Sequence, residues 1–90
     1  MKNLLIINDT SNTGYAVKRD LRPIIEKYKN KFNIEYTDDL EINNLRQKVS
    51  NLDKENSVIL FVLLFKDTTG KYFTYKQSFA QVKEVSQVPI

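Results

Sequence analysis

The sequence predicts an α/β protein in which strands and helices alternate along the chain and the strands form one parallel sheet. Short apolar runs alternate with segments whose apolar residues recur at helical spacing, and short polar stretches connect them. One of these runs, 58–65, contains eight apolar residues in succession, which is typical of a strand covered by helices on both faces. The predicted order is β-α-β-α-β-α-β, a three-layer α-β-α sandwich with a doubly wound parallel sheet.

The first strand and helix are predicted from the N-terminal third of the chain. Leu4–Ile7 is a run of four apolar residues that ends at a stretch rich in Asn, Ser and Thr. In the segment 15–31 apolar residues return every three or four positions, which indicates a helix. We expect Asn12 or Thr13 to cap its start. Pro23 removes one hydrogen bond from the helix interior, so we expect a single helix with a bend.

The remaining elements follow from the same kinds of pattern. Phe32–Tyr36 alternates apolar and polar residues, which predicts an outer strand. Apolar residues at helical spacing predict a second helix over 42–52, and a buried strand follows at 57–64. Thr74 with Gln77 forms the sequence pattern of a capping box that begins a third helix. The residues expected on its inward face are Phe79, Val82 and Val85.

The length of 90 residues corresponds to one domain. The pattern starts on a strand and stops three residues into another one, at Val88–Ile90. We therefore expect residues 1–90 to be a single α/β lobe excised from a larger protein.

Composition excludes several classes of function. The chain contains no Cys and no His, which excludes disulfide scaffolds, cysteine nucleophiles, histidine triads and thiolate or imidazole metal sites. We therefore expect no enzymatic activity, no catalytic residue, no metal and no cofactor. Fourteen Lys and Arg against eleven Asp and Glu give a net charge of +3 with mixed signs, so no nucleic-acid partner is expected. The longest apolar run is far shorter than the roughly 20 residues of a membrane span, so this piece should not insert into a membrane.

The polar residues that could bind a ligand follow the predicted strands. Ligands of open α/β sheets bind beyond the carboxyl ends of the strands. The first loop there offers hydroxyl and amide side chains and a helix N-terminus, which favour an anionic or strongly polar ligand group. It matches no nucleotide-binding motif. The simpler alternative is that Asn12 or Thr13 only caps the helix. The three loops at this edge are 8–14, 37–39 and 65–71.

Two aspartates suggest an alternative function. Asp9 and Asp67 follow neighbouring predicted strands, and two carboxylates at one edge are typical of a Mg²⁺ site in a receiver domain. A receiver domain also has an acidic pair before its first loop, and this sequence has none, which counts against that function. A receiver-like or phosphotransfer domain is kept as the alternative because of the two aspartates.

A series of motifs resembles a known family. Asp9–Gly14 reads Asp-x-Ser-x-Thr-Gly, and Phe65–Asp67 reads Phe-Lys-Asp and precedes Gly-x-x-Phe. The closing segment reads Val-Pro-Ile. In this order and spacing the chain resembles the second lobe of the periplasmic-binding-protein-like sensor region of bacterial signal-transduction proteins. These are mostly histidine kinases, with some diguanylate cyclases of the GGDEF type, and the region is related to the substrate-binding components of ABC transporters. The family usually has Arg where Lys66 stands, and Arg alone offers a planar fork for a carboxylate.

The resemblance implies a flavodoxin-like lobe that forms one wall of a cleft between two lobes. The lobes would close on a small-molecule ligand outside the cytoplasm, in the periplasm or at the cell surface, and signal to the rest of a membrane-anchored polypeptide. A dimerisation module with an exposed strand edge is a further alternative, so a homodimer is a possible partner state. The residues that the resemblance implies for the ligand-binding wall are Asp9, Asn12, Thr13, Phe65, Lys66 and Asp67.

Overall fold

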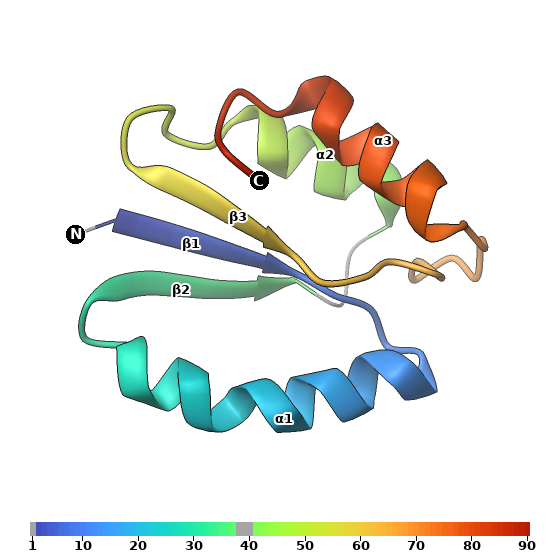
Figure 1. Ribbon diagram of the computed structural model, residues 1–90. Coiled ribbons are helices and arrows are strands. Elements are labelled where there is room, and N and C mark those ends of the chain that lie inside the picture. Colours follow the sequence, from blue (N-terminus) through green and yellow to red (C-terminus); the bar gives the residue numbers. More distant parts are fainter. Residues whose placement is uncertain (1, 38–40) are drawn as a thin grey trace.

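The computed structural model describes residues 2–37 and 41–90, in which three strands alternate with three helices. The strands form one parallel sheet in the order β2-β1-β3 (Figure 1). The α/β class and the parallel sheet are therefore confirmed, with β2 on the outside as its alternating pattern predicts. The elements are β1 (Lys2–Ile7), α1 (Asn12–Tyr28), β2 (Phe32–Thr37), α2 (Ile42–Ser50), β3 (Ser57–Phe61) and α3 (Tyr75–Val85).

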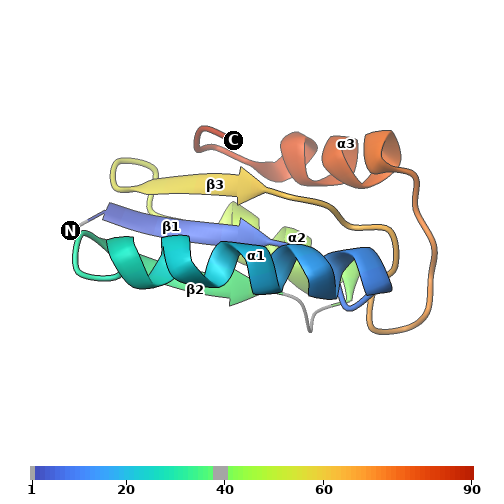
Figure 2. The ribbon, with the colours of Figure 1, turned by 60° about the horizontal axis from the view of Figure 1, so that its bottom comes forward.

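The helices lie on both faces of the sheet. α1 covers one face, and α2 and α3 cover the other (Figures 1 and 2). The connection from β1 to β2 and the connection from β2 to β3 run in opposite directions across the sheet. Right-handed crossovers in opposite directions place their helices on opposite faces. β1 is the central strand, and Leu5, Ile6 and Ile7 are buried between the layers.

α1 begins and ends about three residues earlier than the sequence pattern predicts. The prediction that Asn12 or Thr13 caps the helix is wrong, because both lie in its first turn. Ser11 is the cap, and its Oγ accepts a hydrogen bond of 3.1 Å from the backbone N–H of Gly14. Pro23 lies inside the single helix on its exposed side.

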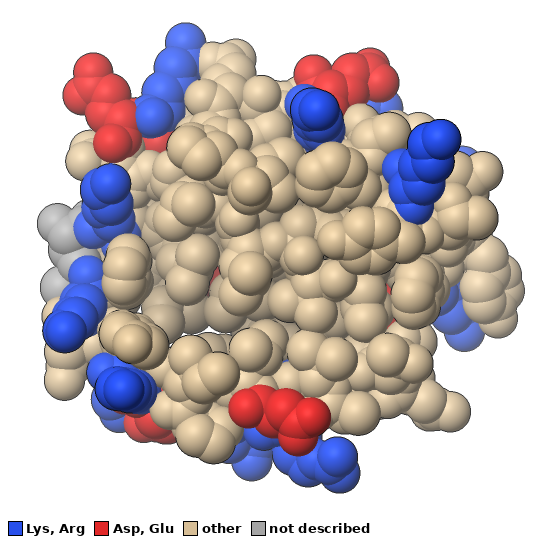
Figure 3. Space-filling model, viewed as in Figure 1, with Lys and Arg blue, Asp and Glu red and all other residues tan. Residues whose placement is uncertain are grey.

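β3 differs from its prediction in length and in burial. It ends at Phe61 rather than at Leu64, because β1 ends at Ile7 and the last backbone bond joins Val62 N–H to that carbonyl. Its face toward α1 is not fully covered, since Leu60 is 41% exposed. Figure 2 shows the cause: α1 crosses in front of β1 and β2 and leaves β3 to one side. Charged side chains lie mainly around the margin of the face that carries β3 and α3 (Figure 3).

The last three residues do not form an assigned strand. The backbone N–H of Ile59 donates to the carbonyl of Pro89 over 2.9 Å, and Val88 is buried. This bond lies at the outer edge of β3, where a fourth strand is predicted. The predicted turn at Asp38–Asp39 lies outside the described residues. Within the described ranges, no helix combines the length and hydropathy that a membrane crossing requires.

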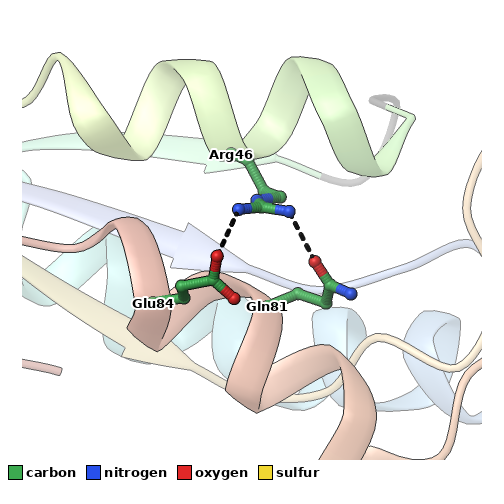
Figure 4. Close-up of polar contacts among 3 residues, drawn as sticks. All are labelled: Arg46, Gln81 and Glu84. Carbon is green, nitrogen blue, oxygen red and sulfur yellow. Dashed lines mark hydrogen bonds and ion pairs between the residues drawn. The ribbon is translucent and has the colours of Figure 1, made fainter.

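The main hydrophobic core lies between the sheet and the α2–α3 layer. Val82 is fully buried there, and Phe79 and Val85 pack against the core, so the predicted inward face of α3 is confirmed. The capping box of Thr74 and Gln77 is also confirmed. A polar clamp joins the two helices outside the core (Figure 4). The Arg46 guanidinium donates to Gln81 Oε1 over 2.8 Å and to Glu84 Oε1 over 3.1 Å.

Candidate functional site

The loops that follow β1 and β3 lie together at the carboxyl edge of the sheet, because the two strands are parallel neighbours. The helices that follow β1 and β2 cover opposite faces (Figure 1), which makes this edge the point where the winding of the chain reverses. Ligands of open α/β sheets bind at such a point. The residues that the resemblance implies for a ligand-binding wall belong to these two loops and to the first turn of α1.

Asp9 ties the two loops together. Its Oδ1 accepts hydrogen bonds from the backbone N–H and the hydroxyl of Ser11, over 3.0 and 2.5 Å. Its Oδ2 accepts from the backbone N–H groups of Phe65 and Lys66, over 2.7 and 3.2 Å. The residue is 2% exposed. The two loops therefore share one edge, as predicted, but they are in direct contact rather than forming opposing rims. The Asp9 carboxylate can contact a ligand only by giving up one of these bonds.

The first turn of α1 packs closely against the end of β1. A Cβ atom added at Gly14 would lie 2.2 Å from the backbone oxygen of Asp9 and 2.3 Å from its Oδ1. Only glycine permits this approach, which explains the glycine that closes the Asp-x-Ser-x-Thr-Gly motif. Asn8 supports the same contact, because its Nδ2 donates to the Gly14 carbonyl over 2.9 Å and to the Tyr36 hydroxyl over 2.5 Å. Sequence reasoning missed Asn8, although a polar residue directly after a buried strand was a usable signal.

Asp67 joins the second loop to α2. Its Oδ2 accepts a 3.1 Å hydrogen bond from the backbone N–H of Ile42, the first residue of that helix, whose own N-cap Glu41 provides no side-chain bond. Its Oδ1 accepts from the N–H and hydroxyl of Thr69 and from the N–H of Lys71. Burial alone would raise the pKa of this carboxyl, but the hydrogen bonds from Thr69, Ile42 and Lys71 outweigh it and hold the pKa below its ordinary value.

The loop that contains Phe65, Lys66 and Asp67 folds back on itself as a small hairpin. Lys66 and Tyr72 form an antiparallel bridge, and the N–H of Phe73 donates to the Phe65 carbonyl over 2.8 Å. The turn closes with the N–H of Gly70 donating to the Asp67 carbonyl. Gly70 has φ of +85°, a conformation that other residues rarely adopt. The hairpin is thus held by its own backbone as well as by Asp9 and Asp67.

The accessible part of this edge combines backbone donors, the half-buried Lys66, the exposed Lys71 and aromatic rings. Asn12 and Thr13 are exposed, and they occupy the first turn of α1, where N–H groups have no acceptor within the helix. No other acceptor for these two N–H groups is recorded in residues 2–37 and 41–90. Phe65 is 36% exposed and Tyr72 is 75% exposed. The Lys66 ammonium lies 5.6 Å from the centre of the Tyr72 ring.

The two aspartates do not form a metal site. A carboxylate has about four lone-pair directions, and each of these two carboxylates accepts four hydrogen bonds from the protein. The described part of the chain contains no group of three or more acidic side chains that could hold a metal ion. The arrangement therefore gives no support to the Mg²⁺-dependent receiver alternative.

No protein-family model, curated protein or solved structure matches this chain. The resemblance to sensor lobes thus rests on the sequence motifs, and the geometry of the carboxyl edge carries the functional argument.

Proposed function

We propose that this chain is one lobe of a ligand-sensing region, in which the carboxyl edge of the sheet forms one wall of a cleft between two lobes. The parent would be an extracytoplasmic, membrane-anchored signal-transduction protein such as a histidine kinase. The observation that carries the proposal is the pair of buried aspartates, Asp9 and Asp67. They hold the two edge loops in one arrangement and leave the first turn of α1 open beside them.

The exposed groups at this edge favour a small molecule with an anionic or strongly polar group. The open N–H groups of Asn12 and Thr13 point out of a helix N-terminus, where the helix dipole stabilises negative charge. Lys66 adds a positive charge, and Phe65 and Tyr72 add apolar surface. The six residues of the predicted wall then divide into four exposed or half-buried residues that contact the ligand and two buried aspartates that position them.

The proposal includes a seven-element, doubly wound lobe of flavodoxin-like topology. Its fourth strand would begin at Val88–Ile90 beside β3, extending the order to β2-β1-β3-β4. The hydrogen bond between Ile59 and Pro89 supports this placement.

Signalling would follow from closure of the two lobes. A ligand shifts a conformational equilibrium only through its higher affinity for one state. One wall buries less of a ligand than a closed cleft does, so binding to the chain alone should be weak, with a Kd of about 1 mM or above.

Chemical-shift titration tests the proposed site. The ¹⁵N-labelled chain is titrated with acetate, glycine, inorganic phosphate and glucose, each to tens of millimolar. We expect at least one of these probes to shift the amide signals of Asn12, Thr13, Phe65 and Lys66. Asn12→Ala keeps the backbone N–H but removes the exposed side-chain amide, and it should weaken that binding roughly fivefold if the amide adds about one hydrogen bond to the ligand. The matched change Asn44→Ala on the exposed side of α2 should leave it unaltered.

Two results would contradict the proposal. One is the absence of saturable shifts at this edge with all four probes. The other is a response in which both alanine variants change the binding equally.

A further inference from the structure

A hollow lies at the amino edge of the sheet, opposite the edge that carries the candidate site. All three strands begin there, because they run parallel (Figure 1). The hollow has a volume of about 240 Å³. Drug-sized ligands occupy pockets of roughly 300 to 1,000 Å³, so this hollow suits a smaller molecule. The polar residues of its lining are Asn3, Asn33, Glu35, Asn51, Asp53 and Ser57.

The strand register places three polar side chains in one row across the sheet. Asn3 of β1 lies beside Asn33 of β2 on one side and beside Ser57 of β3 on the other. Side chains alternate between the two faces of a strand, and Leu5 and Ile59, two residues further along, belong to the core beneath α2 and α3. The row therefore faces the α2 layer, and within it Asn33 Nδ2 donates to Asn3 Oδ1 over 3.1 Å.

Ser57 is the most deeply buried polar residue of this lining, at 7% exposed. Its Oγ is buried, and it has no hydrogen-bond partner within residues 2–37 and 41–90. Such a group is rare, because a buried hydroxyl without a partner has lost its bonds to water and gained none in return. Since no bond fixes the side chain, rotation about χ1 can turn the hydroxyl into the hollow without breaking an interaction. The row therefore offers an unused acceptor to a ligand.

Two exposed carboxylates give the rim of the hollow a negative charge. Glu35 is neutralised by an ion pair with Lys48. Asp53 accepts hydrogen bonds of 3.1 Å from Asn56 Nδ2 and 3.0 Å from the N–H of Glu55, and these bonds lower its pKa. No ion pair of Asp53 is recorded in the part of the chain that the structure describes. The Asp53 carboxylate is therefore ionised at neutral pH and has no cation beside it.

The end of α2 and the apolar part of the lining define the remaining chemistry. Asn51, the C-cap of α2, lines the hollow, and the C-terminus of a helix is the negative end of its dipole. Leu5, Ile34 and Leu52 supply apolar surface between the polar groups. A ligand that suits this lining carries positive charge and hydrogen-bond donors at one end and a short apolar chain at the other.

We propose that this hollow binds a small molecule with a primary ammonium group on a short apolar chain. An ammonium group has three N–H donors and no acceptor, which matches an unused hydroxyl oxygen and a carboxylate. The ammonium donates to Ser57 Oγ, Asp53 supplies the opposite charge, and the chain packs against Leu5 and Leu52. The site lies at the edge of the sheet opposite the proposed cleft wall, so it does not depend on the proposed function.

Chemical-shift titration with propylammonium at pH 7 and low ionic strength tests the proposal, and 1-propanol is the matched neutral probe. We expect propylammonium to shift the amide signal of Ser57 and the side-chain NH₂ signals of Asn3 and Asn33 in a saturable way. The alcohol should bind at least about threefold more weakly, because it has one donor and no charge. Asp53→Asn should weaken propylammonium binding about two- to fivefold, the range that exposed ion pairs contribute. Glu55→Gln is the matched control, because it removes an exposed acid from the same loop outside the lining.

A second variant tests the buried hydroxyl. Ser57→Ala removes the acceptor and should weaken propylammonium binding about fivefold. Because this hydroxyl has no partner in the free protein, the same change should leave the midpoint of urea denaturation equal or higher. The denaturation curve thus separates a loss of binding from a loss of folding.

Any one of three outcomes would overturn the proposal. The first is the absence of saturable shifts around Ser57 with propylammonium up to 100 mM. The second is equal affinity for propylammonium and 1-propanol, or equal weakening by Asp53→Asn and Glu55→Gln, because the ammonium group would then not be recognised at this place. The third is unaltered propylammonium binding by the folded Ser57→Ala variant.

Discussion

Replacing Asp9 with Asn should destabilise the protein by removing hydrogen bonds that join the two edge loops. The carboxylate uses both oxygens as acceptors, one for Ser11 and the other for the N–H groups of Phe65 and Lys66. An Asn side chain has one acceptor oxygen, and its NH₂ group can only donate. In either orientation the NH₂ group replaces one carboxylate oxygen and faces two N–H or O–H donors that it cannot bond. At least two charge-assisted bonds are lost, at about 1.5 to 3 kcal/mol each before relaxation. We expect the free energy of unfolding to fall by about 2 to 4 kcal/mol.

Urea denaturation followed by circular dichroism measures this change. Asp20→Asn is the matched control, because Asp20 lies on the surface of α1 beside Arg19 and its loss should change stability by less than about 0.5 kcal/mol. The Asp9 variant should also broaden or shift the amide signals of Phe65 and Lys66 at neutral pH. A loss below about 1 kcal/mol, with those amide signals unchanged, would refute the view that Asp9 holds the loops together.

Three further substitutions test other parts of the structure. Gly14→Ala should destabilise the protein by about 1 to 3 kcal/mol in urea denaturation, because the new Cβ overlaps the Asp9 backbone and this outweighs the gain in helix propensity; equal stability would contradict the close approach. Folding lowers the pKa of Asp67, so the ionised carboxylate contributes its full stabilisation above about pH 4 and loses it as the pH falls below that value. Asp67→Asn should therefore reduce the free energy of unfolding at pH 7, and the difference from wild type should shrink in acid. A difference that stays constant with pH would contradict a lowered pKa for Asp67. Thr74→Ala should lower the free energy of unfolding by about 1 kcal/mol through loss of the α3 cap, and no change in unfolding would contradict that role.

The secondary structure was largely predictable, because helical spacing and capping patterns depend only on residues close together in the sequence. Helical spacing identified all three helices, and the capping box located the start of α3 within one residue. The cap of α1 was assigned to the wrong residue, since three successive side chains, Ser11, Asn12 and Thr13, are all suitable caps. Only the hydrogen bond from the Gly14 N–H to Ser11 Oγ identifies Ser11 as the cap.

Long-range contacts decided what the sequence did not reveal. The apolar run of β3 predicted that helices cover both faces of the strand, but the position of α1 leaves Leu60 exposed. A run of apolar residues does not indicate which helix covers each face. Asp9 and Asp67 were correctly placed at one edge as polar residues after neighbouring strands. Their use as acceptors for backbone groups up to 57 residues away could not be read from spacing.

Amide hydrogen exchange at the carboxyl edge tests the central claim most directly, namely that buried carboxylates hold the loops while the first turn of α1 stays open. The rates are measured by NMR and divided by the intrinsic rate of each residue. We predict that the amides of Phe65 and Lys66 exchange at least about 100-fold more slowly than those of Asn12 and Thr13. Comparable rates at all four positions would contradict the claim.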